Sequence, residues 1–188
     1  MKTILAATLL LSLAAAQTKP NSSSSQQTPP PAPVSTAKAG DVSSIDAILA
    51  ATYDVISGPA GHKRDWDRFR SLFYPGARLI PTGKRSGDSE VRSRVISPDE
   101  YVERSSPFIE KEGFFERSIA NHVDRYGNIA QVFSTYESRH NANDAQPFQR
   151  GINSFQLMND GKRWWILTIM WQGETSDNPI PAEYLKKQ

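Results

Sequence analysis

Residues 151–173 read GINSFQLMNDGKRWWILTIMWQG. Two runs rich in β-branched and aromatic residues, 151–157 and 163–173, flank the triplet Asn159-Asp160-Gly161. This pattern is typical of a β-hairpin, because Asn, Asp and Gly accept the backbone conformations that tight turns require. The stretch therefore predicts two long antiparallel strands near the carboxyl end of the chain.

A second hairpin pattern comes just before the first. Residues 114–126 and 129–140 flank Gly127-Asn128 and are again rich in strand-forming residues. The last strand, 163–173, is apolar on both of its expected faces, so the sheet needs cover on both sides. We expect a homodimer through the sheet face, and cover by the chain itself is the alternative. Alternation assigns Trp165, Leu167, Ile169 and Trp171 to one face and Trp164, Ile166, Thr168 and Met170 to the other.

Helical patterns precede the hairpins. Apolar residues recur at helical spacing, with turn signals between the runs. Ser97-Pro98-Asp99-Glu100 is a strong helix start, because it combines a Ser cap, Pro at the first position and acids in the first turn. The expected elements are helices over 42–57, 64–73 and 97–113, a short strand over 77–80 and an exposed loop over 84–92. The order predicts an α+β fold in which a strongly curved antiparallel sheet buries one face on the N-terminal helices.

The first forty residues are expected to lie outside this fold. Residues 1–16 combine a basic start, a short apolar run and Ala14-Ala15-Ala16, which is the pattern of a cleavable signal peptide. A membrane anchor is the alternative interpretation. Residues 17–40 are rich in Ser and Pro and predict a disordered linker, with a Pro-rich recognition motif as the alternative. The folded domain is thus expected over 41–188, in an exported protein that is periplasmic or secreted.

Charge and composition exclude several classes of function. Three of the 22 Lys and Arg precede Asp41, whereas all 20 Asp and Glu lie from Asp41 onward, so the domain is close to neutral. Its charges are interleaved, which argues against a nucleic-acid groove. The chain has no Cys, and its three His have no metal-ligand spacing. We therefore expect no metal, no cofactor, no nucleic acid and no membrane contact after signal cleavage.

Three stretches carry a resemblance to a known family. They are Leu72-Phe73-Tyr74-Pro75-Gly76-Ala77-Arg78-Leu79, Tyr126-Gly127-Asn128-Ile129-Ala130-Gln131-Val132 and Leu157-Met158-Asn159-Asp160-Gly161-Lys162-Arg163-Trp164. In this order they resemble the nuclear transport factor 2-like (SnoaL-like) superfamily. Residues 133–139 and 150–154 look more closely like an uncharacterised set of its bacterial exported members.

The resemblance implies a cone, with helices along one side of a bent sheet and a cavity between them. The family includes isomerases, dehydratases and cyclases, but also binding and dimerisation modules, so the fold does not decide whether the chain is an enzyme. Isomerase-like members carry carboxylates at places that correspond to residues 79–82 and 150–153. This chain has no acid in either stretch.

Dehydratase-like members use His and Asp with Tyr, and this chain offers candidates for each role. His122 and Asp124 share a strand face, two residues apart, and Tyr53 in the first helix is a plausible donor. We therefore name His122 and Asp124 as candidate catalytic residues. Asp65 with Tyr136 is a second acid–base pair, and the alternative for His122 is a hydrogen-bonded strand residue.

A mixed polar and aromatic pocket is the better-supported site. A small organic ligand needs apolar walls with a few directed polar groups. The candidate ligand-binding residues are Tyr53, Trp66, Arg78, Ser134, Tyr136 and Asn153. Core packing is the alternative for the aromatic residues, and pairing of Arg78, Arg139 and Arg150 with Glu116 or Glu137 is the alternative for the arginines. Three functions stay open: small-molecule binding, lyase or isomerase chemistry in the same pocket, and dimerisation.

Overall fold

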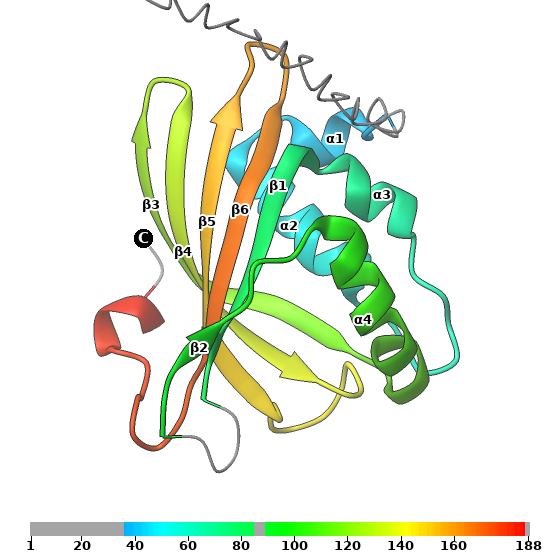
Figure 1. The fold of residues 1–188 in the computed structure, drawn as a ribbon, viewed down its shortest axis with the longest axis vertical. Helices are drawn as coiled ribbons and strands as arrows, with labels where there is room; N and C mark the ends of the chain where they lie inside the picture. The colour runs from blue at the N-terminus through cyan, green and yellow to red at the C-terminus, as the bar shows by residue number, and fades with distance from the viewer. Residues whose placement is uncertain (1–35, 85–88, 187–188) are drawn as a thin grey trace, which may run out of the picture. The chain divides into compact units, whose positions relative to one another are not determined.

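A computed structural model describes residues 36–84 and 89–186 of the chain. The expected signal peptide and nearly all of the expected linker lie outside these residues. Figure 1 shows the elements in order. They are α1 (Ala39–Val42), α2 (Ile45–Ile56), α3 (Trp66–Ser71), β1 (Phe73–Gly83), β2 (Arg92–Ser93), α4 (Pro98–Glu112), β3 (Phe115–Tyr126), β4 (Ile129–Arg139), β5 (Gln149–Asn159), β6 (Trp164–Gly173) and the 3-10 helix η1 (Ala182–Leu185).

The first predicted helix is two helices in the structure. α1 begins at Ala39, inside the segment expected to be linker, and ends at Val42. Ser44 then caps α2, because its side chain accepts a hydrogen bond from the backbone N–H of Ala47 at 3.0 Å. Asp41 binds Arg68 of α3 instead of capping the helix, with 2.7 Å between Oδ2 and Nε.

The start of α4 follows the sequence signal closely. Ser97 and Glu100 form a reciprocal capping box around Pro98, which occupies the first helical turn. The helix continues through Pro107 and ends at Glu112, and Gly113, which follows it, has φ of +73°. A Cβ there would lie 2.7 Å from the carbonyl oxygen of His140, so glycine is required at this position.

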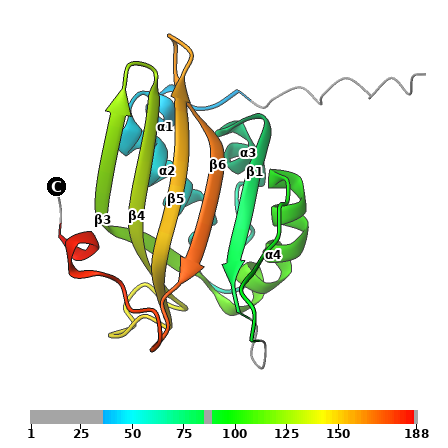
Figure 2. The same cartoon turned by 60° about the vertical axis from the view of Figure 1, so that its left-hand side comes forward.

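The six strands form one sheet in the order β2-β1-β6-β5-β4-β3. Both predicted hairpins are confirmed, since β3 pairs antiparallel with β4, and β5 with β6. β1 lies parallel to β6, so the sheet is mixed rather than wholly antiparallel as expected. Figures 1 and 2 show the sheet bending strongly, with α2, α3 and α4 on one side of it and η1 on the other.

Bulges decide which residues face the helices. In β6, Leu167 is an extra residue, because Ile166 and Thr168 pair with the consecutive residues Leu157 and Gln156. The bulge reverses the alternation, so Trp164 and Ile166 join Ile169 on the inner, helix-facing side. The face assignment predicted from simple alternation was therefore wrong for the first half of this strand.

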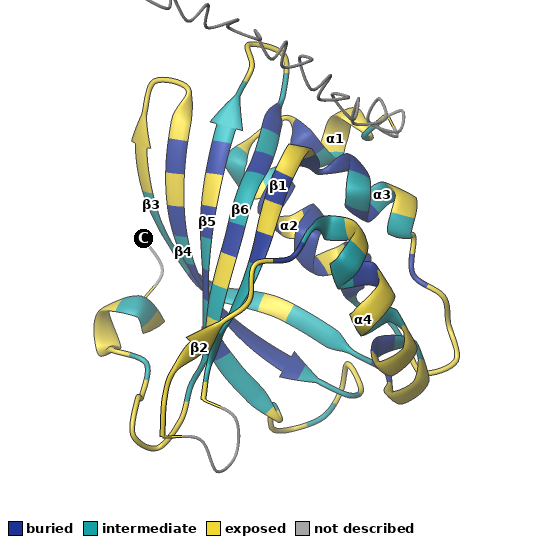
Figure 3. Cartoon of the chain, viewed as in Figure 1, coloured by how far each residue is buried: buried dark blue, intermediate teal, exposed yellow. Residues whose placement is uncertain are grey.

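The hydrophobic core lies between the inner face of the sheet and α2 and α3. Figure 3 shows buried residues alternating with more exposed ones along β5 and β6. On α2 the buried residues are Ile48, Leu49, Ala51, Thr52, Tyr53, Val55 and Ile56. The largest apolar side chains that are almost completely buried are Phe69, Phe155, Ile48, Leu49, Leu72 and Ile166. Burial of six such side chains contributes roughly 10 kcal/mol to the gross hydrophobic stabilisation.

The outer face of the sheet is covered in part by the chain itself. The segment after β6 returns across β3 and β4, and its η1 helix lies on the opposite side of the sheet from α2 (Figure 2). Tyr184 packs against His122 and Phe133, and its carbonyl accepts a 2.6 Å hydrogen bond from Thr135 Oγ1. Met170 on β6 stays 45% exposed. The expected homodimer through this face stays a prediction.

Candidate functional site

A single carboxylate on the inner face of β3 is the centre of the candidate site. Glu116 pairs in register with Ser138 of β4, whose hydroxyl donates to Glu116 Oε2 at 2.7 Å. Asn153 Nδ2 on β5 lies 3.4 Å from the other oxygen, Oε1. These two donors leave further lone pairs on the carboxylate, because an ionised carboxylate offers about four acceptor sites.

Glu116 has no cationic partner among the residues that the structure describes. The two arginines that are closest along β3 and β4, Arg117 and Arg139, both bind Glu137 at 2.5 Å. Burial raises the pKa of Glu116 to about 7, and the hydrogen bonds from Ser138 and Asn153 offset only part of this shift. The group is therefore about half ionised near neutral pH, which is unusual for a glutamate.

A chain of hydrogen bonds runs from Glu116 to the edge of the site. Asn153 Nδ2 also donates to the hydroxyl of Tyr53 at 3.1 Å, and that hydroxyl lies 2.6 Å from Ser134 Oγ. Ser134 donates to Ser118 at 3.2 Å, and Ser118 donates to Asn121 Oδ1 at 2.7 Å. Because Ser134 has only one proton, which it gives to Ser118, Tyr53 is the donor to Ser134.

Two further tyrosines approach the same carboxylate. Burial raises the pKa of Tyr53, Tyr101 and Tyr136, and the negative charge of Glu116 raises each of them further. The ring of Tyr136 passes over Gly151, its partner across β4 and β5, where a Cβ would lie 2.5 Å from the tyrosine hydroxyl. Glycine at 151 therefore lets Tyr136 lie flat against the strand.

These groups line an inner cavity and an outer groove. The cavity, between the inner sheet face and the helices, has a volume of about 130 Å³, and about half of its lining residues are aromatic. The groove runs between α2 and the edge strand β3 and has a volume of about 760 Å³. Tyr53 and Glu116 line both spaces. A molecule in the groove would thus meet Glu116 before it reached the cavity.

The structure brings together four of the residues that the sequence nominated. Tyr53 and Ser134 form a hydrogen bond, Asn153 forms hydrogen bonds with both Tyr53 and Glu116, and Tyr136 lines the cavity. They lie on α2, β4 and β5, so three elements that are distant along the chain position them. These four residues therefore lie together, and their role in binding a ligand stays a prediction.

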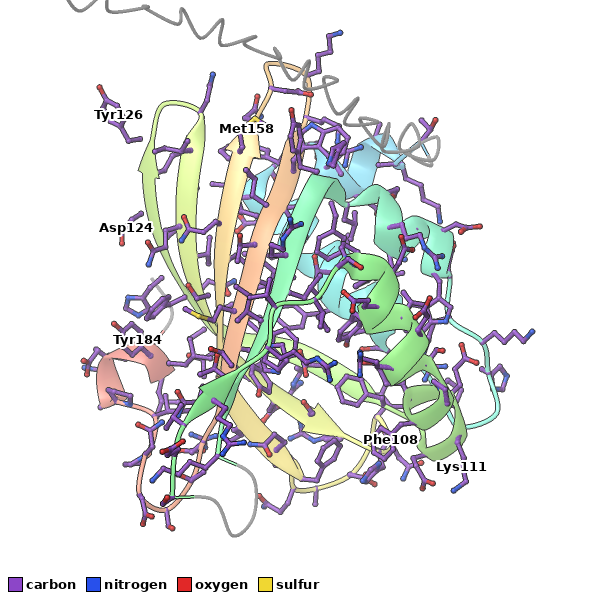
Figure 4. All side chains as sticks on the ribbon, viewed as in Figure 1. Phe108, Lys111, Asp124, Tyr126, Met158 and Tyr184 are labelled. Carbon is purple, nitrogen blue, oxygen red and sulfur yellow. The ribbon has the colours of Figure 1, made fainter. Side chains whose placement is uncertain are left out.

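The two candidate catalytic residues lie elsewhere. His122 and Asp124 share a strand face as expected, but it is the outer one, since they pair with Phe133 and Gln131 on β4. His122 Nε2 lies 2.7 Å from the carbonyl oxygen of Glu183 and its ring contacts Tyr184. Figure 4 shows Asp124 on β3, on the side turned away from the helices. The expectation that both residues share a pocket with Tyr53 was wrong.

Three other nominated residues also have structural roles outside the cavity. Trp66 donates from Nε1 to Glu110 at 2.9 Å and packs on Phe69. Arg78 is exposed and binds the backbone carbonyls of Gly76 and Ala77. Asp65 caps α3 by accepting from the N–H of Arg68.

The alternative of structural arginine pairs is partly confirmed. Arg139 binds Glu137, as expected. Arg150 instead binds Glu174, with 3.1 Å between Nε and Oε2. Neither arginine forms a salt bridge with Glu116 within the described part of the chain, so this carboxylate differs from its neighbour Glu137.

We also searched the described residues for a metal site and for a membrane-spanning helix. No group of three His, Cys, Asp or Glu side chains among them could hold a metal ion. No helix within residues 36–84 and 89–186 is long and apolar enough to cross a membrane.

The chain was compared with family models, curated proteins and solved structures. No family model and no curated protein matches the chain. A solved protein of unknown function with a cystatin-like fold, from Nostoc punctiforme, matches with a TM-score of 0.52 and 11% identity over 70% of this chain and 90% of that chain. An NTF2-like protein of unknown function from Shewanella baltica matches with a TM-score of 0.47 and 14% identity over 70% and 92%. The likeness to the first protein shows that the domain has a cystatin-like fold, which agrees with the helices and the curved, unclosed sheet described above.

Proposed function

We propose that the domain binds a small organic molecule at the Glu116 pocket, made of the inner cavity and the inner end of the groove. The observation that carries this proposal is the position of Glu116. Its carboxylate lines both spaces, keeps free lone pairs and has no cationic partner among the described residues. Buried charges that serve stability alone are normally paired with an opposite charge, so a carboxylate without a cationic partner beside open space favours a ligand.

The shape of the pocket supports the same function. The cavity alone is smaller than the roughly 300 Å³ that a drug-sized ligand needs, but the adjoining groove supplies further room. A ligand would place its apolar part among the aromatic rings and a polar group at Glu116 and Tyr136. Tyr136 suits this role, because it lines the cavity and its phenolic hydroxyl can donate or accept a hydrogen bond.

The test is the capture of a ligand by the full chain. Native mass spectrometry of the purified protein should detect a bound small molecule, which denaturation releases for identification. Ala50→Trp fills the groove from an exposed position on α2 and should abolish capture. Lys111→Trp, on the exposed face of α4, adds the same ring away from the pocket and should leave capture intact. Equal capture by both variants would contradict the proposal.

Acid–base catalysis in the same pocket is a second candidate, and one observation favours it. Glu116 has a pKa of about 7, and a group that exchanges protons works best when its pKa lies near the ambient pH. Glu116 takes the acid–base role first considered for His122 and Asp124. Deuterium exchange from solvent into the captured molecule, followed by NMR, should then occur with the wild-type protein and stop in Glu116→Gln.

We also propose that the chain is exported. Residues 1–16 support this proposal by their basic start, apolar run and small-residue end. Mass spectrometry of the protein from the periplasm or medium should give a mature chain beginning at Gln17. A full-length chain with an intact Met1 would contradict export by this route.

A further inference from the structure

The inner cavity combines many aromatic rings with one carboxylate. Three tyrosines approach Glu116, and four other rings complete the wall: Phe69, Phe114, Phe155 and Trp171. Tyr53 and Phe155 pack edge to face, with ring centroids 6.3 Å apart, and Tyr101 and Trp171 do so at 6.2 Å. Packed rings of this kind hold fixed orientations, so their electron-rich faces form a rigid lining.

Acidic side chains outnumber basic ones among the residues that line the cavity and the groove. Glu116 is the only ionisable side chain other than tyrosine among the residues that line the cavity. The groove adds three carboxylates, Asp46, Asp54 and Asp144, against two guanidinium groups. Those two belong to Arg117 and Arg139, and both are bound to Glu137. Only Asp54 of the groove acids forms a salt bridge among the described residues, to Arg68. The pocket therefore presents an excess of negative charge.

We propose that the pocket selects a small organic ammonium ion, held by the Glu116 carboxylate and by the faces of the surrounding aromatic rings. The inference rests on the proposed function and adds the chemical class of the ligand. Aromatic rings attract a desolvated cation through their quadrupoles, and the attraction is strongest where water is excluded. The positive charge of the ligand supplies the counter-charge that Glu116 lacks among the described residues.

Size and charge both favour this class. A cavity of about 150 Å³ holds a molecule as large as benzene, so the space of about 130 Å³ suits a trimethylammonium group. A longer substituent would extend into the groove past Ser118. An anion would be repelled by Glu116, and a neutral molecule would leave the ionised carboxylate buried without a counter-charge, which is costly.

A matched pair of ligands tests the class. Choline and 3,3-dimethyl-1-butanol have nearly the same shape, but only choline carries a positive charge. Isothermal titration calorimetry of the full chain should show that choline binds more tightly, by about tenfold or more. Glu116→Gln should remove this preference, because the amide keeps the shape and hydrogen-bonding capacity of the side chain without its charge. Glu112→Gln, an exposed site on α4, removes the same charge away from the pocket and should preserve the preference.

The outcomes separate this inference from the proposed function. If the alcohol binds as tightly as choline, the pocket binds ligands but the ammonium inference is wrong. If neither ligand binds and Ala50→Trp captures as much material as the wild type, the proposed function fails as well. Thermal unfolding of Glu116→Gln confirms that the variant is folded.

The pH dependence provides a test that needs no variant. Choline affinity should rise as pH increases through about 7, as Glu116 loses its proton, and the affinity for the alcohol should stay nearly constant. The other titratable and charged groups that face Glu116 or line the adjoining groove are Tyr53, Tyr101, Tyr136, Asp46, Asp54, Asp144, Arg117 and Arg139. None of these side-chain types ordinarily titrates between about pH 6 and pH 8. Choline affinity that does not change over this range would overturn the inference.

Discussion

Replacing Glu116 by Gln should stabilise the protein at alkaline pH and leave its stability unchanged at acidic pH. In the folded protein the pKa of Glu116 is about 7, against an ordinary value of 4.5. At about 1.4 kcal/mol per pKa unit, ionising this carboxyl inside the fold costs about 3 kcal/mol relative to the unfolded chain. Gln avoids the cost and can retain both contacts, because Ser138 can accept from the amide and Asn153 can donate to it.

The sign of the pH dependence follows from the raised pKa. Below the unfolded pKa both states hold the proton, so Glu116 costs nothing. Between 4.5 and about 7 the unfolded chain loses the proton first, and stability falls as pH rises. Above about pH 7 Glu116 is ionised in both states, and the folded protein bears the whole free-energy cost of burying its charge. The free energy of unfolding of Glu116→Gln should therefore exceed that of the wild type by up to about 3 kcal/mol at about pH 8, and by well under 1 kcal/mol at pH 4.5.

Urea unfolding followed by tryptophan fluorescence measures this difference. Every other titrating group is common to both proteins, so the difference between them isolates Glu116. Glu112→Gln is the matched control, because it removes one exposed carboxylate on α4 and should show no gain that depends on pH. If Glu116→Gln gains nothing at alkaline pH, or gains equally at both pH values, Glu116 is not a buried carboxyl with a raised pKa.

Three further predictions concern other parts of the fold. Arg64 is buried and donates hydrogen bonds to backbone carbonyls that include those of Ile56, Gly58 and Ile109. In the same urea assay, Arg64→Met should therefore lower the free energy of unfolding by about 3 kcal/mol. The more exposed Arg70 is the control, and Arg70→Met should lower it by under 1 kcal/mol. Gly151→Ala should cost about 1–3 kcal/mol, because the added Cβ would clash with the backbone carbonyl oxygen of Gln172 and would lie 2.5 Å from the Tyr136 hydroxyl. Calorimetry should show a lower melting temperature, and an unchanged one would mean that neither group lies over this glycine. Sedimentation of the wild-type protein should show a dimer, and a monomeric wild type would contradict this prediction. Met170 is 45% exposed on the outer sheet face, so Met170→Glu places a charge on the expected interface and should give a monomer.

The sequence predicted the elements whose signals are local. The Gly127-Asn128 turn and the capping box at Ser97 depend on neighbouring residues, and both are present where expected. The length of β1 was underestimated, because Pro75 and Gly76 are typical of a turn but lie within an irregular part of the strand. The return of residues 174–186 over the outer face has no local signal, because it depends on contacts with distant strands such as the one between Tyr184 and Phe133.

The candidate site depended on a bulge that the sequence does not reveal. Ile119 is an extra residue in β3, because Ser118 and Ala120 pair with the consecutive residues Tyr136 and Thr135. Counted back from the turn at Gly127, regular alternation would place Arg117 toward the helices and Glu116 outside. The bulge exchanges the two faces before Ile119, so the Glu116 side chain faces the helices. The sequence analysis therefore did not identify Glu116 as a site residue. The available clue was its neighbour Phe114, which also lines the cavity two residues away.

Direct titration of Glu116 tests the central claim that this carboxyl is buried, has no cationic partner among the described residues and is open to a ligand. The 13C chemical shift of its carboxyl carbon, assigned with Glu116→Gln and followed by NMR from about pH 4 to pH 9, should show a midpoint near 7. Adding the molecule released from the purified protein should move that midpoint. A midpoint near 4.5 that no ligand displaces would contradict the account.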